Sequence, residues 1–209
     1  MFITRTRSVL VLAAVAAVGL AGCGDAETGH TTEHGTSTTT SAGPSTSARN
    51  DYNDADVTFL QMMYPHHAQA VEMAQLVPSH TDNQQLRALA TQVEQAQAPE
   101  MQQITALLQS FGKPAPTTSE GHGGHGMPSM PGMPGMMSAE QMAALRAASG
   151  PDFDRQWLTM MIDHHQGAIA MAETELADGR NAEAKGLAQA IIAAQRVEIE
   201  QMRIMLGQS

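Results

Sequence analysis

The 209-residue chain has one cysteine, few aromatic residues and fewer bases than acids. With Cys23 alone, no disulfide can form within the chain, and the 3% of aromatic residues and lack of alternation leave no strand signal. The 11 Lys and Arg against 21 Asp and Glu give a net charge of −10, which argues against nucleic acid and against a basic membrane-binding patch. The chain has instead 16 methionines and 9 histidines, and these carry most of the functional signal.

The N-terminus predicts export. Arg5 and Arg7 precede an apolar run, residues 9–20, that is too short to span a membrane, which is typical of a secretory signal peptide over residues 1–22. The run ends in Leu20-Ala21-Gly22-Cys23, which resembles the lipobox of bacterial lipoproteins. We therefore expect Cys23 to be lipidated and the protein to be anchored to the outer face of the cell membrane; an unmodified thiol is the alternative. Residues 23–50, rich in Ser, Thr and Gly, are predicted to be a flexible tether.

The rest of the chain contains an internal repeat. Residues 54–108 align with residues 152–206 at a constant offset of 98 without a gap, and 18 of the 55 pairs are identical. The densest match pairs Met62-Met63-Tyr64-Pro65-His66-His67 with Met160-Met161-Ile162-Asp163-His164-His165. A gapless match of this length indicates two copies of one structural unit.

Each copy is predicted to be a helical hairpin, with helices over residues 54–77 and 82–110, then 152–178 and 180–207. Asp54 and Asp152 are the expected N-caps. A connector over residues 112–137 and a short helix over 139–149 join the hairpins and can cross the bundle's full length. The expected fold of residues 51–207 is therefore an all-α, ferritin-like four-helix bundle. Pro65, which has no counterpart in the second copy, either bends its helix or begins a second helical segment.

At 100° per residue, the paired histidines fall on the apolar face of the first helix of each copy. His66 lies near the middle of this stripe and His67 at its edge, while Glu100 lies in mid-stripe on the second helix. Neutral imidazole and thioether suit copper, above all Cu(I), whereas carboxylate with histidine suits iron, manganese or zinc. The alternative is a structural polar network with methionine as core filler. The candidate metal ligands are His66, His67, His164, His165, Met62, Met63, Met160, Met161, Met73, Met171, Glu100 and Glu198.

The helical rise limits which of these groups can meet. If the first hairpin turns near residue 80, Glu100 lies level with about residue 60, about 9 Å along the bundle from His66. Glu100 is therefore placed nearer to Met62 than to His66, and no coordination sphere follows from the sequence.

A second metal-binding candidate lies in the connector. Methionines recur there at every third position after two histidines, in a stretch whose Pro and Gly content prevents a stable helix. Thioethers at this spacing are typical of a Cu(I) or Ag(I) binder, and the alternative is a low-complexity linker that tolerates methionine. The candidate residues are His122, His125, Met127, Met130, Met133 and Met136.

The paired motifs also resemble a known family. The resemblance rests on Phe59-Leu60-x-Met62-Met63-x-Pro65-His66-His67, on Trp157-Leu158-x-Met160-Met161-x-Asp163-His164-His165, and on Gln97-x-x-Glu100 and Gln195-x-x-Glu198. It is to domain of unknown function 305, the CopM-like proteins, and covers about residues 50–207. The resemblance implies a ferritin-like helical bundle and, from the copper-binding members, extracytoplasmic copper binding and tolerance. The first copy departs from the pattern at Ala98-Pro99, where the second has Arg196-Val197.

These observations predict a lipid-anchored protein that sequesters copper outside the membrane, with iron or zinc as less favoured metals. A ferritin-like oxidase is the second hypothesis, but the Glu-x-x-His pairs of di-iron bundles are missing, and no nucleophile arrangement indicates another enzyme. A structural or partner-binding lipoprotein without metal is the third.

Overall fold

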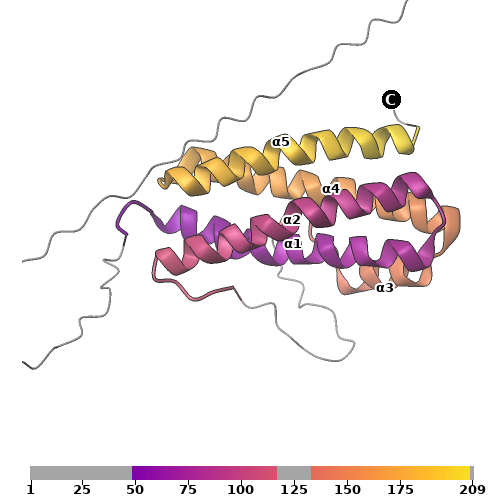
Figure 1. The fold of residues 1–209 in the computed structure, drawn as a ribbon, viewed down its shortest axis with the longest axis horizontal. Coiled ribbons are helices and arrows are strands. Elements are labelled where there is room, and N and C mark those ends of the chain that lie inside the picture. The colour runs from indigo at the N-terminus through magenta and orange to yellow at the C-terminus, as the bar shows by residue number, and fades with distance from the viewer. Residues whose placement is uncertain (1–48, 117–132, 208–209) are drawn as a thin grey trace, which may run out of the picture. The chain divides into compact units, whose positions relative to one another are not determined.

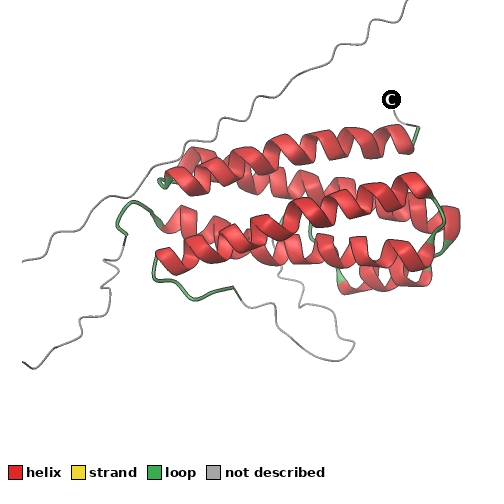
Figure 2. Cartoon of the chain, in the orientation of Figure 1, coloured by secondary structure: helices red, strands yellow, loops and turns green. Residues whose placement is uncertain are grey.

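The computed structural model describes residues 49–116 and 133–207, which form five α-helices and no strand (Figures 1 and 2). This confirms the all-α prediction for the described residues. The predicted signal peptide, the lipidation site Cys23 and nearly all of the predicted tether lie outside them. In the described part, no helix is both long and apolar enough to cross a membrane. The helices are α1 (Asp54–His80), α2 (Gln84–Ser110), α3 (Ala139–Ala147), α4 (Gly150–Asp178) and α5 (Ala182–Met205).

The four long helices form two hairpins that pack on each other. α1 packs against α2 and α4 against α5, while α1 also contacts α4, α2 contacts α5, and the short α3 lies on α4 (Figure 1). The first half of α1 shares an apolar cluster with the second half of α4, so these two helices run antiparallel. The two hairpins therefore meet along an antiparallel α1–α4 seam.

The predicted helix ends need correction. Asn53, not Asp54, caps α1: its side chain accepts hydrogen bonds from the second and third helical residues, and Asp56 completes a capping box. Asp152 is no cap either, because α4 begins at Gly150, next to Pro151, after Ser149, whose side chain makes no capping bond.

The remaining boundaries differ from the prediction by a few residues. α1 continues past residue 77 to His80, α2 and α5 each begin two residues after the predicted start, and α5 ends at Met205. α1 runs through both of its prolines, so Pro65 does not begin a new segment. The connector helix α3 ends at Ala147 rather than at 149.

The turn of each hairpin is tied to the first helix of the other hairpin. In one direction, the buried Asp56 of α1 accepts hydrogen bonds from the backbone N–H groups of Arg180 and Asn181, at 3.0 and 2.8 Å. In the other direction, the Asn83 side chain donates to Asp154 of α4 at 2.9 Å. Since Asp56 and Asp154, like Asn83 and Asn181, are 98 residues apart, corresponding residues hold the two ends of the seam.

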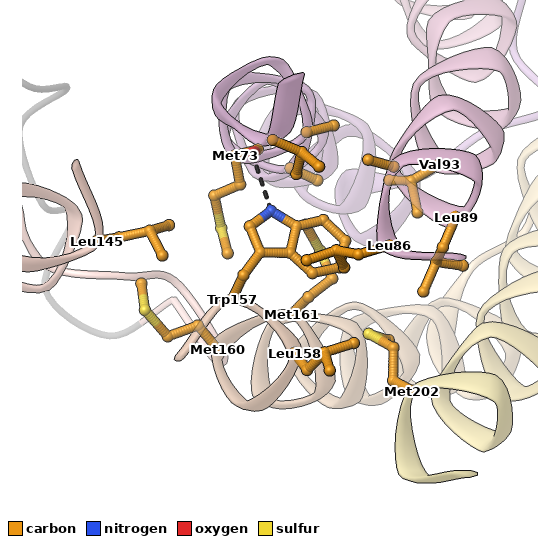
Figure 3. Packing of buried hydrophobic residues seen from close by; sticks show 14 of the residues in the cluster. Met73, Leu86, Leu89, Val93, Leu145, Trp157, Leu158, Met160, Met161 and Met202 are labelled. Carbon is orange, nitrogen blue, oxygen red and sulfur yellow. Dashed lines mark hydrogen bonds between the residues drawn. The ribbon is translucent and has the colours of Figure 1, made fainter. Parts of the chain in front are cut away.

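The core consists of two apolar clusters, one toward each end of the long helices. The first surrounds Trp157, whose indole N–H donates to the backbone carbonyl of Met73 at 2.9 Å, with Leu145 of α3 and Met160 beside it (Figure 3). The second surrounds Phe59, Met63 and Ile191. Each long helix contributes residues to both clusters, and the short stretch between the two contributions is polar.

Candidate metal centre

Between the two apolar clusters lies a layer of polar side chains that we call the polar belt. Each long helix contributes two residues to it, and the members come in pairs 98 residues apart. All four histidines are fully buried, both glutamines are at most 2% exposed, and the glutamates lie at the edge. The belt consists of His66, His67, Gln97, Glu100, His164, His165, Gln195 and Glu198.

The two hairpins meet in the belt through His66 and His164. Their ring centroids are 3.8 Å apart with an interplanar angle of 39°. Each residue belongs to the apolar stripe of its own helix, and the α1–α4 seam brings the two stripes face to face. Imidazole lone pairs lie in the plane of the ring, so an ion shared by these two residues would be held by nitrogens at the edges of the rings rather than between their faces.

The other two histidines each pair with a glutamate of their own hairpin. His67 donates from Nε2 to Glu100 at 2.8 Å, and His165 donates from Nε2 to Glu198 at 2.6 Å. The same bond is made in each copy, between helices α1 and α2 and between α4 and α5. Glu100 thus binds His67, whereas the helical rise alone indicated Met62.

A segment of the connector, residues 133–137, closes over the histidines as a strap. His66 donates from Nε2 to the Pro134 carbonyl at 3.0 Å, and Gln69 makes two bonds with the Met137 backbone, at 2.7 and 2.9 Å. A Cβ at Gly167 of α4 would lie 2.1 Å from the Pro134 oxygen, so only glycine lets the strap come this close. Gln69 and Gly167 are also 98 residues apart, so the strap breaks the equivalence of the two copies.

The hydrogen bonds leave at least one nitrogen of each belt imidazole without a partner. In His66, His67 and His165 the Nε2–H is donated to a carbonyl or carboxylate, which in the neutral ring leaves the lone pair on Nδ1. Nδ1 is buried without a partner in all four histidines, and His164 has no partner on Nε2 either. Nine of the twelve buried polar side-chain atoms without a partner in the described part belong to the belt, including both amide groups.

Burial also keeps the central pair neutral. Loss of solvent, followed by the charge of His67, lowers the pKa of His66 from 6.5 to about 3. Loss of solvent, followed by the charge of His66, holds the pKa of His164 well below its usual range. Each ring is therefore neutral at neutral pH, with one N–H and one free lone pair, and a metal ion can bind that lone pair without displacing a proton.

The predicted methionine ligands flank the belt on both sides. Met73, Met160 and Met161 pack in the cluster around Trp157, while Met63 and Met171 belong to the other cluster and Met62 is half-buried beside it. In residues 49–116 and 133–207, no group of three or more His, Cys, Asp or Glu side chains surrounds a point that could hold an ion. The structure thus divides the predicted ligands into a central histidine pair and two His–Glu pairs.

Sequence reasoning did not assign three contributors to this site. Gln97 and Gln195 were named only as part of the repeated Gln-x-x-Glu pattern and were given no role, although that pattern marks both as matched inward polar groups. The strap contact at Gly167 could not have been found from helical periodicity, because its partner comes from a connector.

The connector candidates divide at residue 133. Met133 is 7% exposed and packs in the cluster around Phe59, and Met136 is half-buried beside it, so both have a packing role that the sequence analysis did not foresee. His122, His125, Met127 and Met130 lie outside the described residues.

Comparison with known proteins gives one family. The family model "Domain of unknown function (DUF305)" matches residues 56–206. A DUF305 fragment from Deinococcus radiodurans is 33% identical, with a TM-score of 0.65, and the match covers 75% of this chain and 98% of that one. A DUF305 protein from Streptomyces coelicolor, described as secreted, is 30% identical, with a TM-score of 0.64 and coverage of 74% and 93%. CopM in its Cu(I)-bound form is 29% identical, with a TM-score of 0.58 and coverage of 72% and 94%. CopM structures also exist in Cu(II)-bound, silver-bound and apo forms. No curated protein sequence matches the chain.

Proposed function

The chain belongs to the DUF305 family, and from this premise we propose that it binds and sequesters copper, with His66 and His164 as the centre of the site. The observation that carries the proposal is the set of four buried Nδ1 atoms without a partner. Buried polar groups in folded proteins nearly always have a partner, so a matched set of bare lone pairs between two packed hairpins favours a ligand that accepts them.

The hydrogen bonds around the belt suit metal ligation. A metal-binding histidine normally donates its second ring N–H to a carboxylate or a backbone carbonyl, which orients the ring and raises its basicity. Three of the four belt histidines do so, toward Glu100, Glu198 and the Pro134 carbonyl. These residues fit copper: the imidazoles would bind it through Nδ1, and the glutamates and the carbonyl would hold the rings.

Cu(I) is the favoured ion. A monovalent ion costs less to bury than a divalent one, and the candidate ligands are neutral nitrogens with thioethers on both sides. The two glutamates are each bound to a separate histidine and so do not form the bridging carboxylate set that iron sites in helical bundles use. Iron and zinc are therefore less favoured. CopM, which has been solved with copper and with silver, supports the same choice.

We assign the protein a binding role rather than an enzymatic one. At the positions where di-iron bundles carry Glu-x-x-His, both copies have Gln-x-x-Glu, and the amide groups of Gln97 and Gln195 make no hydrogen bond. We further propose that the four long helices are a duplicated, ferritin-like bundle. We also propose that the protein is exported and held at the outer face of the membrane through Cys23, consistent with the Streptomyces coelicolor relative being described as secreted.

The test is a Cu(I) titration of the full-length mature protein against a competing chelator such as bicinchoninate. We expect binding to be weakened at least tenfold by the double substitution His66→Asn and His164→Asn, and Zn(II) to bind more weakly than Cu(I). The matched control is His80→Asn, because His80 lies at the far end of α1, stacked on Phe153. Equal affinity for the parent and the double variant, with helical circular dichroism unchanged, would overturn the proposed site.

A further inference from the structure

A groove opens along one half of the α1–α4 seam. It measures about 530 Å³, within the range of small-molecule sites, and its walls are mostly apolar. Phe59 and Met62 of α1 line one wall and Ala170 and Met171 of α4 the other, while Glu175 and Asp54 supply its acidic groups.

The other half of the α1–α4 seam, which carries the equivalent residues of the two copies, is covered by α3. The counterparts of Met62 and Met171 at the offset of 98 are Met160 and Met73, and both belong to the apolar cluster that α3 joins through Met142 and Leu145. Figure 3 shows Leu145 of α3 on the same side of Trp157 as Met160. The chain thus supplies a helix over one half of the seam but leaves the other half open within the described residues. The groove is therefore specific to the half of the seam where Phe59 lies opposite Met171. It is not a general consequence of how two such hairpins pack.

Glu175 is the unusual group in this groove. It is 1% exposed, no N–H group in the described part of the chain donates to its carboxyl oxygens, and its side chain pairs with the carboxyl group of Asp56. Two buried carboxyl groups side by side share one proton, and packing does not require Glu175 here, because the equivalent residue in the first copy is Val77. The pair therefore points to a cation that takes the place of that proton and brings its own donors.

The surroundings of Glu175 define the charge of that ligand. Beside it lies Asp56, which stays ionised because, although burial opposes this, backbone N–H groups donate to it and lower its pKa. Burial, with the neighbouring Asp56, raises the pKa of Glu175 to about 8. Lys185 of α5 acts in the opposite direction at longer range, and Asp54 adds acid at the rim. The end of the groove thus attracts a cation that can replace the proton of Glu175.

We propose that this groove binds a small amphipathic amine, whose ammonium group donates to Glu175 while its apolar part lies on Phe59, Met62 and Met171. A primary ammonium carries three N–H donors, which the carboxyl oxygens require once the proton of Glu175 has left, whereas a quaternary ammonium has the charge but no donor. Because Glu175 holds a proton before binding, that proton passes to solvent when the ammonium takes its place. The site is separate from the polar belt and does not depend on the proposed copper binding.

The experiment is isothermal titration of the metal-free protein at pH 7 with 4-phenylbutylamine. Two control ligands have the same apolar body: 4-phenylbutan-1-ol, which has no charge, and the N,N,N-trimethyl ammonium analogue, which has no donor. We expect the amine alone to bind well, with release of a proton that appears when the heat is compared in buffers of different ionisation enthalpy. Equal affinity for the amine and the alcohol would overturn the proposal, because the groove would then be an apolar site only.

Two substitutions and one control substitution locate the site. Glu175→Gln is expected to weaken binding of the amine about 10- to 100-fold, the range of a charge-assisted hydrogen bond. The control is Glu173→Gln, the same substitution at an exposed position two residues away on α4, which should leave binding unchanged. Ala170→Phe fills the groove from an exposed position without touching the core, so it should abolish binding even if Glu175→Gln perturbs folding. Binding that survives Ala170→Phe would place the amine elsewhere and refute the assignment.

Discussion

The neutral His66–His164 pair makes the stability of the metal-free protein depend on pH. His66 has a pKa of about 3 in the folded protein against an ordinary value of 6.5. Below pH 6.5 the unfolded chain therefore takes up a proton that the folded chain rejects. The stabilising contribution of the neutral ring is complete above pH 6.5 and is lost as the pH falls toward 3. Each pH unit in that window costs about 1.4 kcal/mol, so the loss from pH 6.5 to pH 5 is about 2 kcal/mol from His66 alone.

Other groups act in the same window and have to be removed from the comparison. His164, whose pKa is also lowered, adds to the loss, while Glu175, whose pKa is raised, gains stability as the pH falls. We therefore compare the parent with His66→Phe, which keeps a ring of similar size but cannot take up a proton. The difference between their free energies of unfolding should change by about 2 kcal/mol or more between pH 6.5 and pH 5. Glu175 contributes equally to both proteins, whereas removal of His66 also lessens the lowering of the His164 pKa and so adds to the difference.

Urea denaturation followed by far-ultraviolet circular dichroism, in the presence of a metal chelator, measures this difference. The control is Trp157→Phe, which destabilises the core by removing the bond to the Met73 carbonyl but removes no titratable group, so its pH dependence should parallel that of the parent. Should His66→Phe also parallel the parent within about 0.5 kcal/mol, His66 would not be held neutral by burial, and the proposed arrangement of bare lone pairs would be wrong.

Three further predictions follow from the belt, the strap and the caps. Gly167→Ala forces the strap away from α4, because its Cβ would lie 2.1 Å from the Pro134 oxygen. The free energy of unfolding, measured by urea denaturation, should fall by about 1–3 kcal/mol. Hydrogen exchange of the strap amides should become faster, and unchanged exchange would contradict the contact. Glu198→Gln removes the carboxylate that holds His165, so Cu(I) affinity, measured by chelator competition, should fall about 10- to 100-fold; an unchanged affinity would exclude His165 as a ligand. Asn53→Ala removes both bonds of the α1 cap and should cost about 1 kcal/mol in urea denaturation, and no loss would show that the cap bonds are replaced by water.

The sequence alone determined the features that depend on local periodicity. A spacing of 3.6 residues per turn placed His66 in the middle of an apolar stripe, and His66 is fully buried. The same reasoning gave the order and approximate bounds of all five helices, because apolar pattern, Gly, Pro and capping residues act over a few positions. It missed the α1 cap by one residue, since Asn53 and Asp54 are both good caps and only the position of Asp56 decides between them.

The tertiary structure decided which groups of the site meet. The sequence put His67 at the edge of its stripe and Glu100 nearer to Met62, yet His67 is fully buried and bonded to Glu100. The contact between the His66 and His164 rings could not be predicted from the sequence either. Which side chains touch across a bundle depends on the axial shift and crossing of packed helices, and these are set by the summed packing of both clusters rather than by any short stretch of chain. Periodicity fixes the face on which a residue lies, but the partner on the opposite helix is fixed only when the whole core packs.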